Sequence, residues 1–273
     1  MRRVVLALVV VVALAWPLSA ASVDGLKIHS SVSGSGRGAI VFVHGWTCDS
    51  SSWAAQVPVF AKQYRVLTLD LPGHGKSASP ADAMFSMALF ARAVEAVRAE
   101  AKVDRIVLVG HSMGAPVIRQ YAQLYPQHVA GLVAVDGPLD MRNFASGGFK
   151  PPVVTGPDGL KNRETMIKGM FTPQTPPALQ QQILAMMLHA PESTAAGAMQ
   201  SILDPALAKM APAPMPALAI YAGTAQLPKV DEVRQVLPKF EATQVAGTGH
   251  FVMMEKPEEF NRLLSAFLEK ITF

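Results

Sequence analysis

The sequence predicts an α/β fold in which a mostly parallel central sheet carries helices on both faces and receives a small helical cap insertion. Continuously apolar runs, typical of strands buried on both faces, recur along the chain. Stretches with helical spacing of apolar residues separate most of these runs, and one long segment, residues 137–213, interrupts the alternation. Strands that alternate with helices form parallel sheets, because each crossover helix packs on a face of the sheet.

Composition supports one globular domain. The chain has 273 residues, of which 50% are hydrophobic and 16% charged, so it can bury a sizeable core and is too hydrophobic for disorder. We expect the core to comprise residues 22–136 and 214–273. The net charge is only +4 and no basic stripe occurs, so the expected partner is a small-molecule substrate and not nucleic acid. No feature of the sequence indicates an oligomeric state.

Residues 1–21 have the features of a secretory signal peptide. Two arginines open the segment, a thirteen-residue apolar run follows at 4–16, and small residues end it at 17–21. A helix that crosses the hydrocarbon layer needs about twenty apolar residues, so a stable membrane anchor is the less favoured interpretation. The sequence therefore predicts export to the periplasm or the medium after cleavage. The single cysteine, Cys48, excludes an intrachain disulfide and is expected to be a packed thiol.

The strands follow in chain order. Residues 25–33 alternate polar and apolar side chains and predict a short strand or strand pair. Buried strands are predicted by the apolar runs at 39–43, 65–70, 105–109, 128–135 and 217–221. A last strand is expected at 243–246. Helical spacing is clearest at 84–101 and 116–125, and an amphipathic helix is expected at 257–271.

The predicted cap, residues 137–213, is rich in proline, glycine and methionine and contains no strand-like run. Its helices are expected near 180–189 and 194–203. Its methionines are compatible with an adaptable apolar pocket or with simple filling of the core. They are Met166, Met170, Met186, Met187 and Met199.

The residues Gly110-His-Ser112-Met-Gly114 match the pattern G-x-S-x-G, and their position between a predicted strand and a predicted helix makes the match specific. They follow a predicted buried strand directly and open a predicted helix, as a nucleophile elbow requires. The strained turn lifts one hydroxyl above the sheet edge, and small flanking residues let the strand and the helix approach. Ser112 is the predicted nucleophile.

A serine hydroxyl needs a base within hydrogen-bond reach to attack at neutral pH. His250 lies between the last predicted strand and the final helix, and it fits the chain order of nucleophile, acid and base. It is the predicted base. His44, His74 and His111 are expected to hydrogen-bond the backbone and to shape loops.

Acyl transfer also needs two fixed N–H donors directed at the developing oxyanion. Met113, the residue after the nucleophile, offers one main-chain N–H at the start of a helix. Trp46, in the turn after the first long buried strand, offers the other. No metal-ligand spacing is found in the sequence, and this chemistry needs no metal or organic cofactor.

With these motifs the chain resembles the compact, capped α/β-hydrolases, a subgroup that includes epoxide hydrolases, haloalkane dehalogenases, carbon–carbon bond hydrolases, cofactor-free haloperoxidases and many esterases. The resemblance covers about residues 25–273. It depends on four segments in the expected order, at 41–46, 69–77, 109–114 and 249–257. The serine at position 112 separates the chain from the dehalogenases and epoxide hydrolases, which use a carboxylate nucleophile, so acyl chemistry is favoured.

The resemblance leaves the acid of the triad open. Family members usually carry it in a G-x-x-D arrangement, where this chain has Gln226. Some relatives place it after the strand that follows the elbow helix, and Asp136 matches that placement and is the preferred candidate. Asp231 is the alternative acid, although it also fits a helix N-cap, and Asp140 is a third candidate.

The resemblance implies a serine hydrolase that cleaves small to medium carboxylic esters or lactones through an acyl-enzyme. Carbon–carbon bond hydrolysis and cofactor-free haloperoxidase or perhydrolase activity are alternatives, because the same triad serves them. A non-catalytic ligand-binding protein on the same scaffold is a further alternative, motivated by the uncharged Gln226 at the usual acid position.

Overall fold

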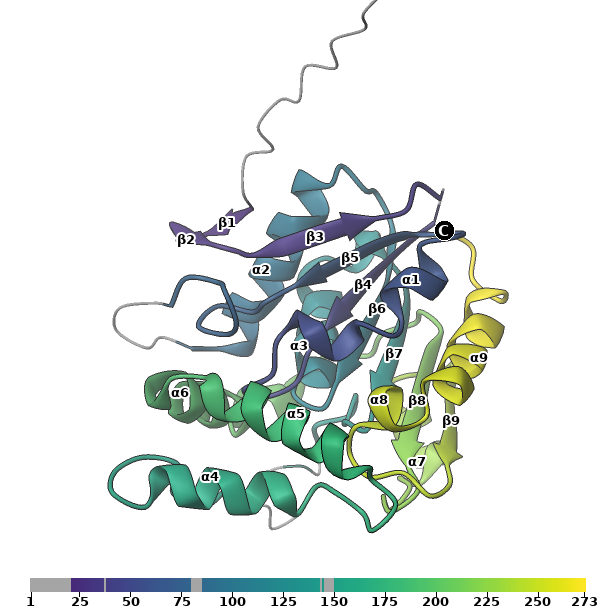
Figure 1. Cartoon of the computed structure of the whole chain (residues 1–273). Helices are drawn as coiled ribbons and strands as arrows, with labels where there is room; N and C mark the ends of the chain where they lie inside the picture. Colours follow the sequence, from purple (N-terminus) through teal and green to yellow (C-terminus); the bar gives the residue numbers. More distant parts are fainter. Residues whose placement is uncertain (1–20, 37, 80–84, 143, 145–149) are drawn as a thin grey trace, which may run out of the picture.

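The structure, a computed structural model, describes residues 21–36, 38–79, 85–142, 144 and 150–273 (Figure 1). The predicted signal peptide, residues 1–21, lies outside the described residues apart from Ala21. None of the described helices combines the length and the hydrophobicity needed to span a bilayer.

The predicted fold class is confirmed: the described residues form a mostly parallel seven-stranded sheet with helices around it (Figure 1). The strand order is β3-β5-β4-β6-β7-β8-β9, and only β3 runs antiparallel to its neighbour, β5. The strands are β3 (Ser30–Ser33), β4 (Ala39–Val43), β5 (Arg65–Leu69), β6 (Ile106–His111), β7 (Val129–Val135), β8 (Ala217–Ala222) and β9 (Phe240–Val245). Two short strands, β1 (Ser22–Val23) and β2 (Leu26–Lys27), pair with each other before the main sheet begins.

The central strands form where the sequence is continuously apolar. Every residue of β4, β6 and β7 is buried, because helices cover both faces of the sheet. On one face, Phe42 of β4 packs on Trp53 with ring centroids 4.8 Å apart, and Trp53 reaches Phe260 of the C-terminal helix. On the other face, α2 and α3 pack against each other, and the Tyr121 hydroxyl donates to the Glu95 carboxylate (2.7 Å).

The helices of the core are α1 (Val57–Phe60), α2 (Met87–Glu100), α3 (Gly114–Leu124), α7 (Val230–Arg234), α8 (Val252–Glu255) and α9 (Pro257–Leu268). Short 3₁₀ turns occur at η1 (Ser50–Trp53), η2 (Pro126–His128) and η3 (Pro205–Lys209). The helix α3 begins at Gly114, two residues before the predicted start, because it opens directly on the elbow.

Residues 137–213, which we call the insertion, connect β7 to β8. The helices in their described part lie beyond the carboxyl ends of the parallel strands (Figure 1). The described part of the insertion contains α4 (Gly159–Lys168), α5 (Pro177–His189) and α6 (Glu192–Ile202). The last two correspond to the helices expected near 180–189 and 194–203. The sequence did not predict α4, and it predicted the start of β9 three residues too late, at 243 instead of Phe240.

Candidate active site

The predicted site residues lie where the order of the strands reverses. Chain order runs from β4 to its neighbour β5 and only later to β6 on the other side of β4. Loops that leave β4 and β6 therefore diverge, and this leaves a crevice at the carboxyl ends of the strands, the usual ligand site of open parallel sheets. Trp46 follows β4 and Ser112 follows β6.

Ser112 occupies a strained turn between β6 and α3. Its φ angle is +51°, in the left-handed region that residues other than glycine rarely adopt. The turn is held by a hydrogen bond from the Ser112 N–H to the Val135 carbonyl (2.9 Å). A Cβ at Gly110 would lie 2.3 Å from the Gly114 carbonyl oxygen, and one at Gly114 would lie 2.5 Å from that of Val43. The two flanking glycines are therefore required by close backbone approach, as the elbow predicts.

The turn that carries Trp46 lies against the nucleophile. A Cβ at Gly45 would lie 3.2 Å from Ser112 Cβ. The main-chain N–H groups of Trp46 and Met113 have no acceptor in the part of the chain that the structure describes, and both residues line the same cavity as Ser112. They are therefore available to hold an oxyanion. The Trp46 ring is anchored separately, because its Nε1–H donates to the Ala195 carbonyl in α6 (2.8 Å).

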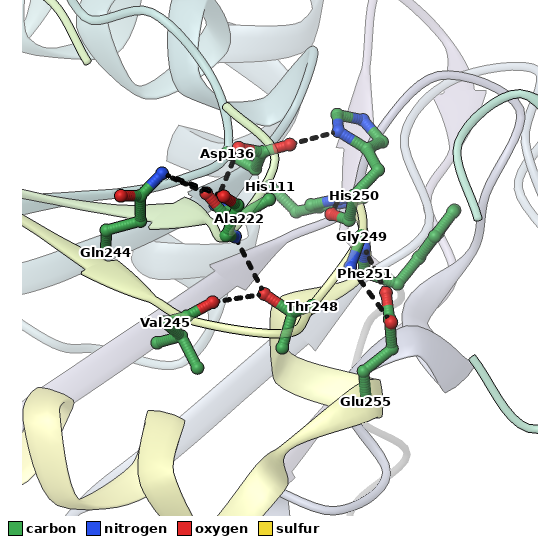
Figure 2. A network of polar contacts seen from close by, with 11 residues as sticks. His111, Asp136, Ala222, Gln244, Val245, Thr248, Gly249, His250, Phe251 and Glu255 are labelled. Carbon is green, nitrogen blue, oxygen red and sulfur yellow. Dashed lines mark hydrogen bonds and ion pairs between the residues drawn. The ribbon is translucent and has the colours of Figure 1, made fainter. Parts of the chain in front are cut away.

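His250 and Asp136 form a hydrogen-bonded pair (Figure 2). Nδ1 of His250 lies 2.5 Å from Oδ2 of Asp136, and Oδ1 of Asp136 accepts from the Ala222 N–H (2.9 Å). Burial alone would raise the pKa of Asp136, but the hydrogen bond from His250 and the charge of its ring lower that pKa below its ordinary value. The carboxylate is therefore ionised and accepts from Nδ1–H of His250, so Nε2 is the ring nitrogen left for other contacts.

Ser112 and His250 line one cavity, although no hydrogen bond joins their side chains among the described residues. Hydrogen bonds of catalytic groups are often long in the free enzyme and shorten in the complex with substrate. The cavity thus brings together five residues predicted from the sequence, namely Trp46, Ser112, Met113, Asp136 and His250.

Asp231, the alternative acid, does not contact His250. It lies in the first turn of α7, where Lys229 and not Asp231 is the N-cap, and its carboxylate is 98% exposed and 3.6 Å from Arg234. Asp140 instead forms an ion pair with Arg142 (2.8 Å). Of the three candidates, Asp136 alone reaches the histidine.

The end of β8, shortly before Gln226 at the usual acid position, supports Asp136 through its backbone. Nε2 of Gln244 donates to the carbonyl of Ala222 (2.8 Å; Figure 2). It also donates to the carbonyl of Ala225 (2.9 Å) and so fixes the turn that follows β8. Ala222, the last residue of β8, presents its N–H to Asp136. The sequence did not predict this contact, because a main-chain donor leaves no signature in residue types.

The other histidines near the site have structural contacts. His111 is buried, and its Nε2–H donates to the carbonyl of His250 (2.9 Å). Burial, followed by the charge of His250, lowers the pKa of His111 to about 3, so the ring is neutral and positions the His250 backbone. His44 donates from Nδ1 to the Gly45 carbonyl (2.8 Å) and accepts at Nε2 from the Leu71 N–H (2.9 Å). Nδ1 of His74 lies 3.0 Å from the Pro72 carbonyl oxygen.

The cavity has a volume of about 220 Å³ and a mostly apolar wall. Four of the five methionines named from the sequence line it: Met166, Met170, Met187 and Met199. Met186 lies elsewhere and accepts at its sulfur from the Ser52 hydroxyl (3.4 Å). Cys48 also lines the cavity, and burial raises the pKa of its thiol, so it is not an activated nucleophile. No lysine or arginine is among the described residues that line it.

Comparison with known proteins relates the chain to proteins of the alpha/beta hydrolase fold. A family model described as alpha/beta hydrolase fold matches residues 38–164. The dihydrolipoyllysine-residue acetyltransferase component of the acetoin cleaving system of Cupriavidus necator is 27% identical over 91% of the chain, and the chain spans 68% of its length. The chain spans 65% of the length of the counterpart from Pseudomonas putida. A 2-hydroxy-6-oxononadienedioate/2-hydroxy-6-oxononatrienedioate hydrolase of Paraburkholderia phymatum is 28% identical over 89% of the chain and 91% of its own length.

Two solved structures share the whole fold. Est816, described as an N-acyl homoserine lactone degrading enzyme, is 25% identical with a TM-score of 0.76, covering 90% of this chain and 99% of Est816. A thermophilic esterase from Thermogutta terrifontis is 23% identical with a TM-score of 0.77, covering 92% and 96% of the two chains. Together with the strand order and the elbow between β6 and α3, these matches show that the chain has the alpha/beta hydrolase fold.

Proposed function

We propose that the protein is a serine hydrolase that cleaves small to medium carboxylic esters or lactones through an acyl-enzyme intermediate. The observation that carries the proposal is the pair of His250 and Asp136, joined at 2.5 Å, in the cavity that Ser112 also lines from its strained turn. The esterase and the lactone-degrading enzyme among the structural neighbours support the same class of chemistry.

The geometry supports the following cycle. His250 Nε2 takes the proton of Ser112 as the hydroxyl oxygen attacks the carbonyl carbon, and the N–H groups of Trp46 and Met113 stabilise the oxyanion. His250 then protonates the leaving alcohol, and the acyl-enzyme remains. Water, deprotonated by His250, releases the acid, while Asp136 holds the imidazole and compensates its positive charge.

The cavity wall favours an uncharged acyl group. Its apolar side chains, including Met166, Met187 and Ile202, can cover an alkyl chain, whereas no cation is available among the described lining residues to pair with a carboxylate. Burial of an unpaired carboxylate is costly. A volume of about 220 Å³ also lies below the roughly 300–1,000 Å³ of typical drug-sized ligand sites, so a short or medium chain is the better fit.

The test is an ester profile measured on the purified chain. We expect turnover of p-nitrophenyl esters, with kcat/KM highest for acyl chains between acetate and octanoate and falling at decanoate. The kcat/KM for p-nitrophenyl hexanoate should exceed that for the mono-p-nitrophenyl ester of adipic acid by about tenfold or more. The adipate ester has a terminal carboxylate, which would lose its hydration in the cavity without gaining a partner.

Bromination of monochlorodimedone with peroxide, measured on the same sample, separates the alternatives. Hydrolysis of esters without bromination supports the proposal. Bromination without ester turnover would establish haloperoxidase chemistry instead, and the absence of both activities would favour a binding protein.

A further inference from the structure

The loop that carries His250 is fixed on both sides by one carboxylate. Glu255 ends α8, and its Oε2 accepts from the Gly249 N–H (3.0 Å). Its Oε1 accepts from the Phe251 N–H (3.2 Å). Figure 2 shows both bonds converging on Glu255 from the residues before and after the histidine. The carboxylate therefore holds the short piece of backbone from which the imidazole projects.

The same carboxylate reaches the insertion. Its Oε2 also accepts from the hydroxyl of Thr175 (2.8 Å), which is buried in the turn between α4 and α5. The Thr175 hydroxyl accepts from the N–H of Thr172 (3.0 Å) and donates its single proton to Glu255. Glu255 thus joins the His250 loop to the insertion.

A second contact runs parallel to this one. The His250 N–H donates to the carbonyl of Met170 (3.0 Å), and a Cβ at Gly249 would lie 2.5 Å from the same oxygen. The two backbones are therefore in direct contact, and position 249 has no room for a side chain. Met170 also lines the cavity, so the part of the insertion that encloses the substrate also holds the base.

We propose that Glu255 is a positioning residue that keeps His250 in the orientation for proton transfer and fastens the insertion to the His250 loop through Thr175. This inference rests on the proposed ester hydrolase function. Glu255 is not among the described residues that line the cavity, so it acts through His250 and not on the substrate. Displacement of a catalytic group by about 1 Å can cost roughly 100-fold in rate, and it affects the chemical step more than binding.

The first variant is Glu255→Gln. Glutamine keeps the size of the side chain, but its amide offers one acceptor oxygen and one NH₂ group where three donors now converge. We expect kcat for p-nitrophenyl butyrate to fall by about 10- to 100-fold with little change in KM. Glu258→Gln is the matched control, because Glu258 is an exposed glutamate at the start of α9, and it should leave both constants unchanged.

A second pair of variants isolates the link to the insertion. Thr175→Val keeps the shape of the side chain and removes only the hydroxyl, so kcat should fall, whereas Thr175→Ser keeps the hydroxyl and should retain the kcat of the unaltered chain. Glu255→Gln and Thr175→Val remove one shared hydrogen bond. The loss in the double variant should therefore be smaller than the product of the two single losses.

The outcomes separate the inference from the function on which it rests. If the unaltered chain hydrolyses esters, and folded Glu255→Gln and Thr175→Val both keep its kcat, the positioning role is wrong and the proposed function stands. A lower melting temperature with unchanged kcat per folded molecule would equally overturn the role. Should Glu255→Gln fail to fold, the comparison of Thr175→Val with Thr175→Ser decides. An inactive unaltered chain would instead refute the proposed function.

Discussion

Replacement of Ser112 by alanine is expected to lower kcat for p-nitrophenyl butyrate by about 10⁶-fold, the loss typical when the nucleophile of a serine hydrolase is removed. Without the hydroxyl no acyl-enzyme forms, and only the oxyanion donors and the binding of substrate continue to assist the reaction. The fold should survive, because an alanine at a φ angle of +51° is strained to a similar degree as the serine already there.

The control for this variant is Ser51→Ala. Ser51 is an exposed serine whose hydroxyl contacts the sulfur of Met186, and it is not among the described residues that line the cavity. Its replacement should leave kcat unchanged. Melting curves of both variants should overlay that of the unaltered chain. Hydrolysis by Ser112→Ala at a tenth or more of the original rate would contradict the assignment of the nucleophile.

Asp136→Asn is expected to lower kcat by about 10⁴-fold, the loss measured when the acid of a serine protease triad is replaced by its amide. Asparagine can still accept the Ala222 N–H through its oxygen, but it then directs an NH₂ group at Nδ1 of His250. That contact favours the tautomer with the proton on Nε2, which cannot accept the proton of Ser112. The measurement is kcat with p-nitrophenyl butyrate between pH 6 and 9.

Asp231→Asn is the matched comparison. The Asp231 carboxylate is almost fully exposed, and among the described residues it pairs only with Arg234, so its replacement should leave kcat unchanged. Equal, mild losses in the two variants would contradict the role of Asp136. A large loss in Asp231→Asn alone would require α7 to rearrange during catalysis.

The sequence predicted the central strands of the sheet correctly, but it placed the start of the edge strand β9 too late and missed the helix α4. In β4 every residue faces a covered side of the sheet, so burial and apolar character coincide along the run. In β9, an edge strand, only Phe240 and Val245 are buried, and the polar residues between them concealed its first half. In α4 the buried residues include Gly159 and Arg163, so no apolar periodicity marks the helix.

The residues of the candidate site were predictable to different degrees. Ser112 lies in a local motif whose glycines are required by backbone contacts, and His250 lies at a fixed place in the chain order. The acid could not be decided from the sequence, because three aspartates had suitable positions and only the tertiary structure shows which one reaches the histidine. Glu255 was missed, since one carboxylate that accepts main-chain N–H groups has no signature in residue spacing.

The most direct test asks whether His250 makes the hydroxyl of Ser112 reactive. The purified chain is treated with a fluorophosphonate probe at neutral pH, and the labelled peptide is identified by mass spectrometry, in parallel with folded His250→Ala. We expect stoichiometric phosphonylation of Ser112 in the unaltered chain and a rate at least about 1,000-fold lower in the variant. An unlabelled Ser112 in the folded chain, or labelling that is indifferent to His250, would contradict this expectation.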